Sequence, residues 1–157
     1  MIRRCTLVCV GKQKGWAAEG SEDYEKRLRR YFPTNIIEIA VEDINRNSRH
    51  EVLSAEGERI LKRLPTEAYV ISLDRERGKQ QPSEKLARKL EDVGVSGRSH
   101  VAFVIGGPLG LSPEVLSKSH ELWSFGKITL PHALARVVLL EQIYRAVKIQ
   151  RREKYHW

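Results

Sequence analysis

The chain has 157 residues, of which 41% are hydrophobic and 31% charged. This composition excludes a disordered tail, and the apolar runs are too short to span a bilayer. The chain starts directly with a strand-like run and lacks the long apolar stretch and cleavage site of a secretory signal. We therefore expect a cytoplasmic protein, or an organellar one if a transit peptide has been removed.

Basic residues outnumber acidic ones. Lys and Arg total 28 and Asp and Glu total 20, which gives a net charge of +8. A surplus of this size on a small chain favours a polyanionic partner such as nucleic acid. Two segments concentrate the basic residues, namely 26–30 and the C-terminal end with Arg145, Lys148, Arg151, Arg152 and Lys154. A solvated basic surface, or cations placed at helix C-termini, would give the same pattern.

The first half of the chain alternates between strand and helix patterns. Residues 2–10 are rich in Val, Leu and Cys and predict a strand, and the apolar spacing over 16–31 predicts a helix. Residues 35–41 predict a second strand. A polar loop at 45–49 then leads into a second helix, which we expect to end near Leu64.

The first strand carries the two cysteines of the chain, Cys5 and Cys9. Their spacing places both side chains on one face of the strand, too far apart for a disulfide without a bend. No further Cys or His nearby completes a zinc site. The pattern favours two buried, reduced thiols over a metal or redox site.

The second half of the chain continues the alternation. Two apolar runs, 68–73 and 101–105, predict buried strands. The remaining expected elements are a helix that opens at Pro82, a short helix capped by Ser112, a short strand at 122–125 and a last helix from 131 to about 152. We therefore predict an α/β fold with a mostly parallel sheet flanked by helices, in a single domain over residues 1–157.

The last helix is apolar on more than one face. Residues 137–140 are four apolar residues in a row, whereas the surface helix of a monomer needs only one apolar stripe. The extra face indicates either a subunit interface or a central helix buried by its own domain. Arg136 and Glu141 lie within this apolar stretch, where a salt bridge is the default interpretation and a substrate-binding Arg the sharper one.

Three further segments suggest chemistry. Residues 106–110 are glycine-rich and follow a strand directly, at the edge where α/β sheets bind ligands, although a structural turn fits as well. In residues 126–132, backbone amides at a helix start could hold a polar ligand. His132 is a candidate proton carrier, or a cap or packed side chain. The aromatic tail 155–157 suggests docking, on an RNA base or on a neighbouring subunit.

Taken together, these segments resemble the RlmH family of SPOUT methyltransferases, the pseudouridine methyltransferases of large-subunit ribosomal RNA. The resemblance covers essentially the whole chain. Its most specific parts are, in chain order, Leu130-Pro131-His132, Leu134, Arg136-Val137, Glu141, Tyr144-Arg145-Ala146 and Tyr155-His156. The sequence departs from the family pattern in the loop at 73–78, which is one residue longer than expected, at Leu109 and Ala133, and in the tail at 152–154 and Trp157.

The resemblance implies a SPOUT fold with a C-terminal trefoil knot and a homodimer whose active site draws on both subunits. It implies S-adenosylmethionine as cofactor, no metal, no membrane, and ribosomal RNA in the ribosome or large subunit as partner. The residues expected to bind the cofactor are Leu73, Gly107, Gly126, Lys127, Ile128, Thr129, Leu130 and Pro131. The acceptor implied is N3 of a pseudouridine in 23S-type RNA.

The catalytic candidates follow from this chemistry. An imide N–H is a poor nucleophile until it loses its proton, so a base or a stabilising cation would help. His132, Tyr155 and His156 are candidates for proton handling, and Arg136 and Arg145 for charge stabilisation or phosphate contact. Two alternatives remain, a SPOUT-like enzyme that acts on another RNA such as tRNA, and a noncatalytic RNA-binding module.

Overall fold

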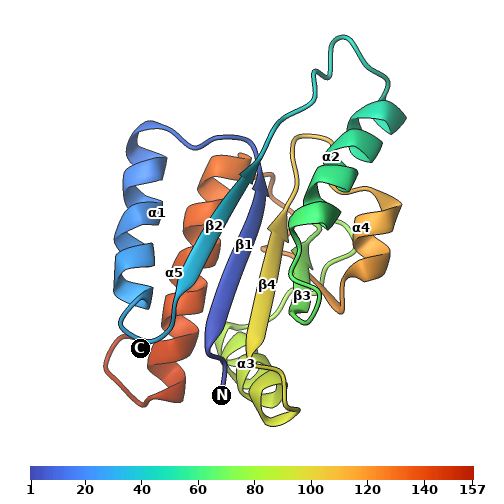
Figure 1. The fold of residues 1–157 in the computed structure, drawn as a ribbon. Helices are drawn as coiled ribbons and strands as arrows, with labels where there is room; N and C mark the ends of the chain where they lie inside the picture. Colours follow the sequence, from blue (N-terminus) through green and yellow to red (C-terminus); the bar gives the residue numbers. More distant parts are fainter.

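A single five-stranded sheet organises the chain, with helices on both of its faces (Figure 1). The computed structural model describes residues 1–157. The strands lie in the order β2-β1-β4-β3-β5, and all neighbouring strands are parallel. They are β1 (Arg4–Val10), β2 (Thr34–Ile39), β3 (Tyr69–Leu73), β4 (His100–Ile105) and β5 (Glu121–Trp123). This arrangement confirms the predicted α/β fold.

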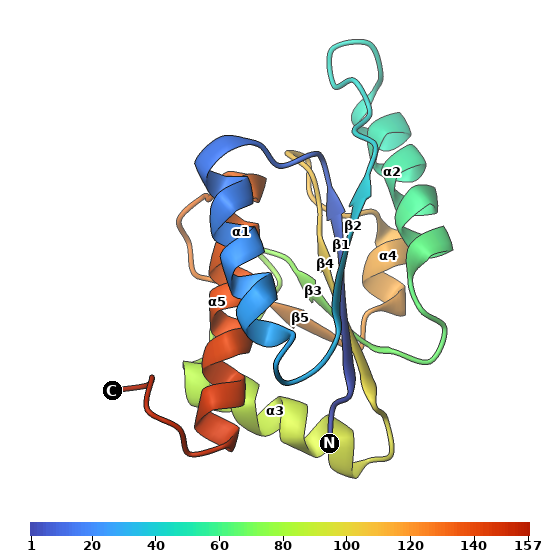
Figure 2. The same cartoon turned by 60° about the vertical axis from the view of Figure 1, so that its left-hand side comes forward.

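The helices divide into two layers (Figure 2). One face of the sheet is covered by α1 (Gly15–Leu28), α3 (Ser83–Val95) and α5 (His132–Gln150), and the other by α2 (Arg49–Arg63) and α4 (Pro113–Lys118). Side chains alternate across the strands, so each layer has its own core. A cluster of 21 buried residues lies under α1, α3 and α5, and one of 10 lies under α2 and α4.

All ten elements occur in the predicted order, but several end earlier than expected. Helix α1 ends at Leu28 rather than near residue 31, because Tyr31 and Phe32 donate their amides back to the Leu28 carbonyl in a turn. Strand β2 ends at Ile39, and Val41 beyond it is 52% exposed. These predictions followed the apolar residues alone, so they extended beyond the last residue that the hydrogen bonds of the helix or the sheet hold.

The predicted helix starts have physical causes that the structure shows. Ser48 and Glu51 form a reciprocal capping box at the start of α2, in which each side chain accepts the other residue's amide at 3.2 Å. Ser112 caps α4 by accepting the amide of Val115 at 3.3 Å, with Pro113 at the first helical position. These caps fix where α2 and α4, the two helices of one layer, begin.

Both cysteines are buried in the larger core and neither forms a disulfide, as predicted. Burial raises the pKa of Cys9 to about 11, and it raises that of Cys5 further. These thiols therefore stay protonated and pack as small apolar side chains. No helix has the length and apolar character that crossing a bilayer requires.

Helix α5 lies between α1 and α3 and is buried over much of its length (Figure 2). Leu139 and Leu140 are fully buried, whereas Val137 and Val138 are only partly so. Burial by the chain's own helices and sheet therefore explains Leu139 and Leu140, the second half of the apolar run. The subunit interface that we considered for its remaining face stays a prediction.

The loop 74–79 surrounds the segment at β5 from two sides. The amide of Asp74 donates to the Trp123 carbonyl at 2.9 Å, on the side where β5 pairs with β3. On the opposite side, Lys79 donates its amide to Leu122 at 2.9 Å and accepts that of Ser124 at 3.0 Å. The strand is thus held within the loop by backbone hydrogen bonds on both edges, a geometry that agrees with the expected knot. The knot itself stays a prediction.

Gly78 makes this enclosure possible. A Cβ atom at this position would overlap the backbone of Trp123 and the carbonyl oxygen of Asp74. Backbone cannot move aside as a flexible side chain can, so only glycine fits here.

We predict that Gly78→Ala lowers the free energy of unfolding by about 1–3 kcal/mol or more, since any shift must break the backbone bonds around β5. Urea unfolding followed by circular dichroism measures this. Gly20→Ala is the matched control. Gly20 lies within α1, and a Cβ there would be 3.5 Å from the Val137 side chain, an ordinary van der Waals contact. The control should be neutral or stabilising by up to about 1 kcal/mol. Equal effects of the two substitutions would contradict the enclosure as the critical constraint.

Candidate active site

The ends of four parallel strands meet at the carboxyl edge of the sheet. Gly11 follows β1, Asp74 follows β3, Gly106 follows β4 and Ser124 follows β5. In open α/β sheets this edge is the usual ligand site. The residues expected to bind the cofactor lie at the end of β3 (Leu73) and in the connections after β4 (Gly107) and β5 (126–131), so the structure brings this group together at one edge.

The glycines of residues 106–110 form a tight turn. Gly110 has φ +87° and donates its amide to the Gly107 carbonyl at 3.0 Å. A Cβ on Gly106 would lie 2.6 Å from the Gly110 carbonyl oxygen. A Cβ on Gly107 would face inward, 3.2 Å from a Val10 methyl and 3.3 Å from a carboxylate oxygen of Glu56. The protein's own packing therefore requires glycine at 106 and leaves little room for a side chain at 107, whether or not the turn also binds a ligand.

Glu56 is a buried carboxylate that sequence reasoning missed. It is 2% exposed, and one oxygen accepts the Glu42 amide at 3.0 Å while the other has no partner. A signal was present in the sequence, since Val52, Glu56 and Ile60 share the apolar face of α2 at a spacing of four. An acidic residue in such a stripe indicates a specific polar contact in the core.

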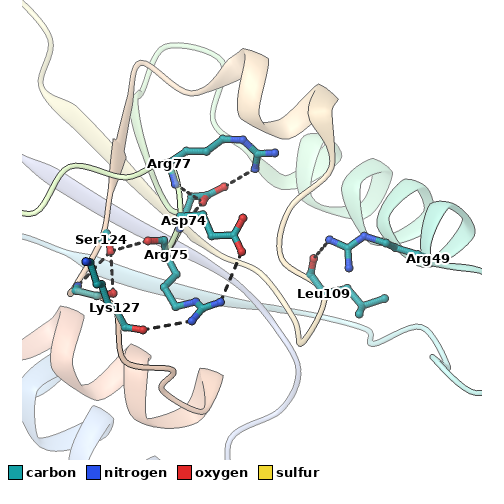
Figure 3. Close-up of polar contacts among 9 residues, drawn as sticks. Arg49, Asp74, Arg75, Arg77, Leu109, Ser124 and Lys127 are labelled. Carbon is teal, nitrogen blue, oxygen red and sulfur yellow. Dashed lines mark hydrogen bonds and ion pairs between the residues drawn. The ribbon is translucent and has the colours of Figure 1, made fainter.

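The lengthened loop at 73–78 ties two parts of the edge together (Figure 3). The Arg75 guanidinium donates to the Lys127 carbonyl at 3.2 Å, and the Arg75 carbonyl accepts the Ser124 hydroxyl at 3.1 Å. Asp74 accepts the amide and the guanidinium of Arg77 at 2.8 and 3.0 Å. Burial alone would raise the pKa of Asp74, but these hydrogen bonds hold it below its usual value. The carboxylate stays ionised and stiffens the loop.

The segment 126–131 combines exposure with unbonded amides. Gly126 has φ +111°, and its amide donates to the Ser124 hydroxyl at 3.1 Å. Lys127, Ile128 and Thr129 are exposed, and their amides donate no hydrogen bond to another backbone group. Pro131 then precedes the first turn of α5. A row of free amides beside a glycine turn suits an adenine ring or another polar ligand.

Arg136 is held in the core by three acceptors from the β1 and β2 ends. It is 3% exposed and donates to Glu38 at 2.9 Å, to the Gly11 carbonyl at 3.0 Å and to Gln13 at 3.3 Å. Burial would raise the pKa of Glu38, but the Gln13 amide and the guanidinium keep it low. The default salt bridge is thus the one observed, with a partner 98 residues away, and a catalytic role for Arg136 stays a prediction.

His132 packs its imidazole against Gly11. A Cβ on Gly11, which has φ +97°, would lie 2.8 Å from the ring carbon Cε1, so the glycine leaves room for the ring. The Nδ1 atom is buried and has no partner. This geometry matches the packed side chain that we considered, and it does not test proton transfer by His132.

The tail residues join a second polar cluster at the far end of α5. Glu141 accepts the Arg145 guanidinium at 2.7 Å and the Tyr155 hydroxyl at 3.1 Å. His156 lies between Arg145 and Glu84, at 3.2 Å from the guanidinium and 2.8 Å from the carboxylate. Because a guanidinium only donates, Nδ1 of His156 acts as acceptor and Nε2 carries the proton towards Glu84.

Aromatic packing holds this tail cluster in place. The Tyr155 ring stands edge-on to Tyr144 at 4.9 Å, and the Arg145 guanidinium lies 4.8 Å from the Tyr155 ring centroid. Burial and the neighbouring Tyr24 and Glu141 raise the pKa of Tyr155, so its hydroxyl stays protonated and donates. Tyr155 docks on its own chain, a surface that we did not consider from the sequence, whereas Trp157 is 97% exposed. Docking of the tail on an RNA base or on a neighbouring subunit stays a prediction.

One chain does not bring the two predicted groups of residues together. The cofactor group lies before the first turn of α5, and Arg145 follows Pro131 by 14 positions. At 1.5 Å per residue this is a separation of about 20 Å along the helix. An open groove of about 500 Å³ lies on the outer side of α5, lined by Gln80, Gln81, Trp123, Ser124, Phe125, Val138 and Gln142.

Comparisons with known proteins agree on one class of enzyme. A family model described as "Predicted SPOUT methyltransferase" matches residues 3–156. A protein of Rubrobacter xylanophilus named Ribosomal RNA large subunit methyltransferase H is 65% identical over 158 residues, covering 100% of both chains. A protein of the same name from Bifidobacterium adolescentis is 45% identical and covers 98% of this chain and 99% of its own.

Solved structures support the same fold at low identity. A probable methylase family protein from Haemophilus influenzae has a TM-score of 0.54 at 18% identity, covering 100% of this chain and 72% of its own. A probable methyltransferase from Bordetella pertussis gives 0.52 at 14%, covering 92% and 96%. A structure described as showing 2-OH methylation of C/U34 on tRNA gives 0.50 at 16%, covering 93% and 92%.

We predict that Arg136→Met lowers the free energy of unfolding by about 2–3 kcal/mol, less than for a fully buried pair because Glu38 is 35% exposed. Arg59→Met is the control, since its ion pair with Glu42 lies at the surface and contributes below about 1 kcal/mol. The low pKa of Glu38 stabilises the fold above the unfolded pKa, and this contribution is lost as the pH falls through the folded pKa. The difference in the free energy of unfolding between wild type and Arg136→Met should therefore become smaller at acid pH. A difference that persisted unchanged at low pH would contradict the ion pair as its source.

Proposed function

Because the chain belongs to the SPOUT methyltransferase family, we propose that it methylates large-subunit ribosomal RNA, with S-adenosylmethionine as the methyl donor and N3 of a pseudouridine as the acceptor. The observation that carries the proposal is full-length identity of 65% to a relative named for this activity on large-subunit RNA. Such a protein works where ribosomes are, in the cytoplasm or in an organelle. The single domain and the trefoil knot belong to the same proposal.

The donor would be held at the carboxyl edge of the sheet. Leu73 is half-buried and offers an apolar surface for the adenine ring, beside the turn at Gly107. The unbonded amides of 127–129 provide hydrogen-bond donors with no local acceptor. Arg75 supports this segment through the Lys127 carbonyl, so the backbone is already positioned before the ligand enters. The donor set therefore fits S-adenosylmethionine, which supplies a methyl group activated on a sulfonium.

The acceptor nitrogen must lose its proton as it gains the methyl group, and the tail cluster provides groups for this step. Arg145 would stabilise the developing negative charge of the imide. His156 is the candidate for receiving the proton at Nδ1, and Tyr155, which stays protonated, could only relay it. Arg136 is buried at the other end of α5 and His132 packs against Gly11 there, so we assign them to positioning of the Gly11 turn rather than to contact with the base.

The distance between these groups favours a homodimer. Since the donor residues and Arg145 lie about 20 Å apart on one helix, a second chain would have to bring its tail cluster to the donor residues of the first. The partly exposed residues of α5, Leu134, Val137, Val138, Glu141 and Gln142, offer a surface for this pairing. The complete site would then form only between two chains.

A different RNA substrate is the second candidate. It is favoured by the fold similarity to the structure described for C/U34 of tRNA, but that similarity has 16% identity and supports the fold alone. The 65% identity over the whole chain favours ribosomal RNA.

We expect wild-type protein to transfer radiolabelled methyl groups to large-subunit RNA of ribosomes lacking the modification, with label mapped to a pseudouridine. Arg145→Met should reduce the rate at least ~100-fold without changing donor affinity, because the cation acts on the transition state. Lys62→Met on α2 is the exposed control and should behave as wild type. Label found only in tRNA would overturn the substrate, and absence of donor binding would favour the noncatalytic module.

A mixed dimer tests the shared site. We expect Gly107→Leu to abolish donor binding and Arg145→Met to abolish transfer, each measured in a variant that circular dichroism shows to be folded. A purified heterodimer of the two should regain about half of the wild-type rate, since one of its two sites combines an intact donor segment with an intact tail. A heterodimer as inactive as its parents would show that each site is built within one chain. Ile128→Glu serves as a second donor-site variant if Gly107→Leu is unfolded.

A further inference from the structure

The structure brings together the two basic segments of the sequence. Helices α1 and α5 run in the same direction, and their C-terminal ends lie side by side (Figure 2). Tyr31 after α1 donates its hydroxyl to Glu153 after α5 at 2.8 Å. The Arg151 guanidinium lies 4.8 Å from the Tyr31 ring centroid. Residues more than 100 positions apart therefore form one continuous surface, beside the tail cluster.

Most charges on this surface neutralise one another. Residues 22–31 and 141–154 contain nine Lys and Arg and five Asp and Glu. Each of the five acids pairs with a different cation, in the pairs Glu22–Lys26, Asp23–Arg27, Glu25–Arg29, Glu141–Arg145 and Glu153–Lys148. Four exposed cations are left without a carboxylate, namely Arg30, Arg151, Arg152 and Lys154. We call these four residues the terminal basic surface.

Arg152 occupies a position where its side chain is unfavourable for the backbone. It has φ 56°, the only positive φ outside glycine. Its amide donates to Ile149 and that of Glu153 to Lys148, the two bonds of a Schellman motif that ends α5. Glycine is the favoured residue at this position, and an arginine there costs roughly 1–2 kcal/mol. A charged side chain kept at a glycine position indicates a use for the charge.

We propose that the terminal basic surface binds the phosphate backbone of the RNA next to the nucleoside that the tail cluster receives. This inference rests on the proposed function and adds the path of the RNA on the protein. Lys154 directly precedes Tyr155 and His156, so phosphates held here would lie one or two nucleotides from a base at the tail cluster. The unpaired cations attract the chain of phosphates, whereas the paired ones near them hold the aromatic rings in place.

The test compares two triple variants with equal loss of charge. Arg30→Gln with Arg152→Gln and Lys154→Gln removes the surface, and Lys62→Gln with Arg63→Gln and Lys118→Gln removes three exposed, unpaired cations from the opposite layer. Affinity for large-subunit RNA lacking the modification is measured over a range of KCl concentrations. The first variant should bind at least ~10-fold more weakly at low salt, and its salt slope should fall by about 2 to 3. The control should match wild type. Equal losses in both variants, or none in the first, would overturn the proposal.

Arg152 allows a second test that separates charge from folding. Arg152→Gly should fold at least as stably as wild type, because glycine suits the positive φ, yet should lower the salt slope by roughly 0.7 to 0.9. Arg152→Lys keeps the charge and should retain the wild-type slope. Wild-type RNA affinity in a folded Arg152→Gly variant would overturn the contact.

Failure of this proposal and failure of the proposed function are distinguishable. A wild-type protein that binds the RNA through this surface but transfers no methyl group would overturn the function and keep the surface. A triple variant that binds and methylates as wild type does would overturn the surface and keep the function. Donor affinity, measured by calorimetry, should be the same in all variants, since none of the substituted cations is among the donor residues.

Discussion

The enclosure of β5 by the loop 74–79 is the constraint on which the carboxyl edge depends. Backbone hydrogen bonds from Asp74 on one side and Lys79 on the other fix residues 122–124. The loop approaches Trp123 so closely that no side chain fits at Gly78. The chain therefore leaves β5 at a set place and direction. From there the segment 126–131 leads into α5, which lies between α1 and α3. The enclosure therefore sets where the free amides begin.

The buried Arg136 fixes the other boundary of the same region. A buried charge is costly unless it is paired, and here Glu38, Gln13 and the Gly11 carbonyl accept from the two terminal nitrogens of Arg136, while its Nε has no partner. These acceptors come from the ends of β1 and β2, so the ion pair fastens the first turns of α5 to the half of the sheet that the loop 74–79 does not touch. Two unlike interactions, one between backbones and one between charges, thus hold opposite sides of the α5 start.

The sequence predicted the order and type of the elements because apolar periodicity, prolines and caps are local signals. It predicted that Arg136 would be paired, but not that the partner is Glu38, since no local pattern connects residues 98 positions apart. Glu56 left a signal in the spacing of α2 that was not used. No signal in the sequence indicated the role of Arg75, because a hydrogen bond to a carbonyl depends only on how two loops meet. The cofactor residues were named by resemblance; the structure shows them at one edge and leaves the tail residues far from them.

Helix α5 explains why chemistry is confined to its two ends. Its 19 residues extend about 28 Å, and its middle is buried against the sheet and two helices, where polar groups without partners are unfavourable. Most residues in the middle of the helix are buried, and the predicted donor residues and Arg145 lie towards its opposite ends. Under the proposed function, a reaction that combines a donor at one end with a cation at the other would use two copies of the helix. In such a pair, the terminal basic surface of one chain would guide RNA to the donor segment of the other, so the dimer and the RNA path are parts of one arrangement.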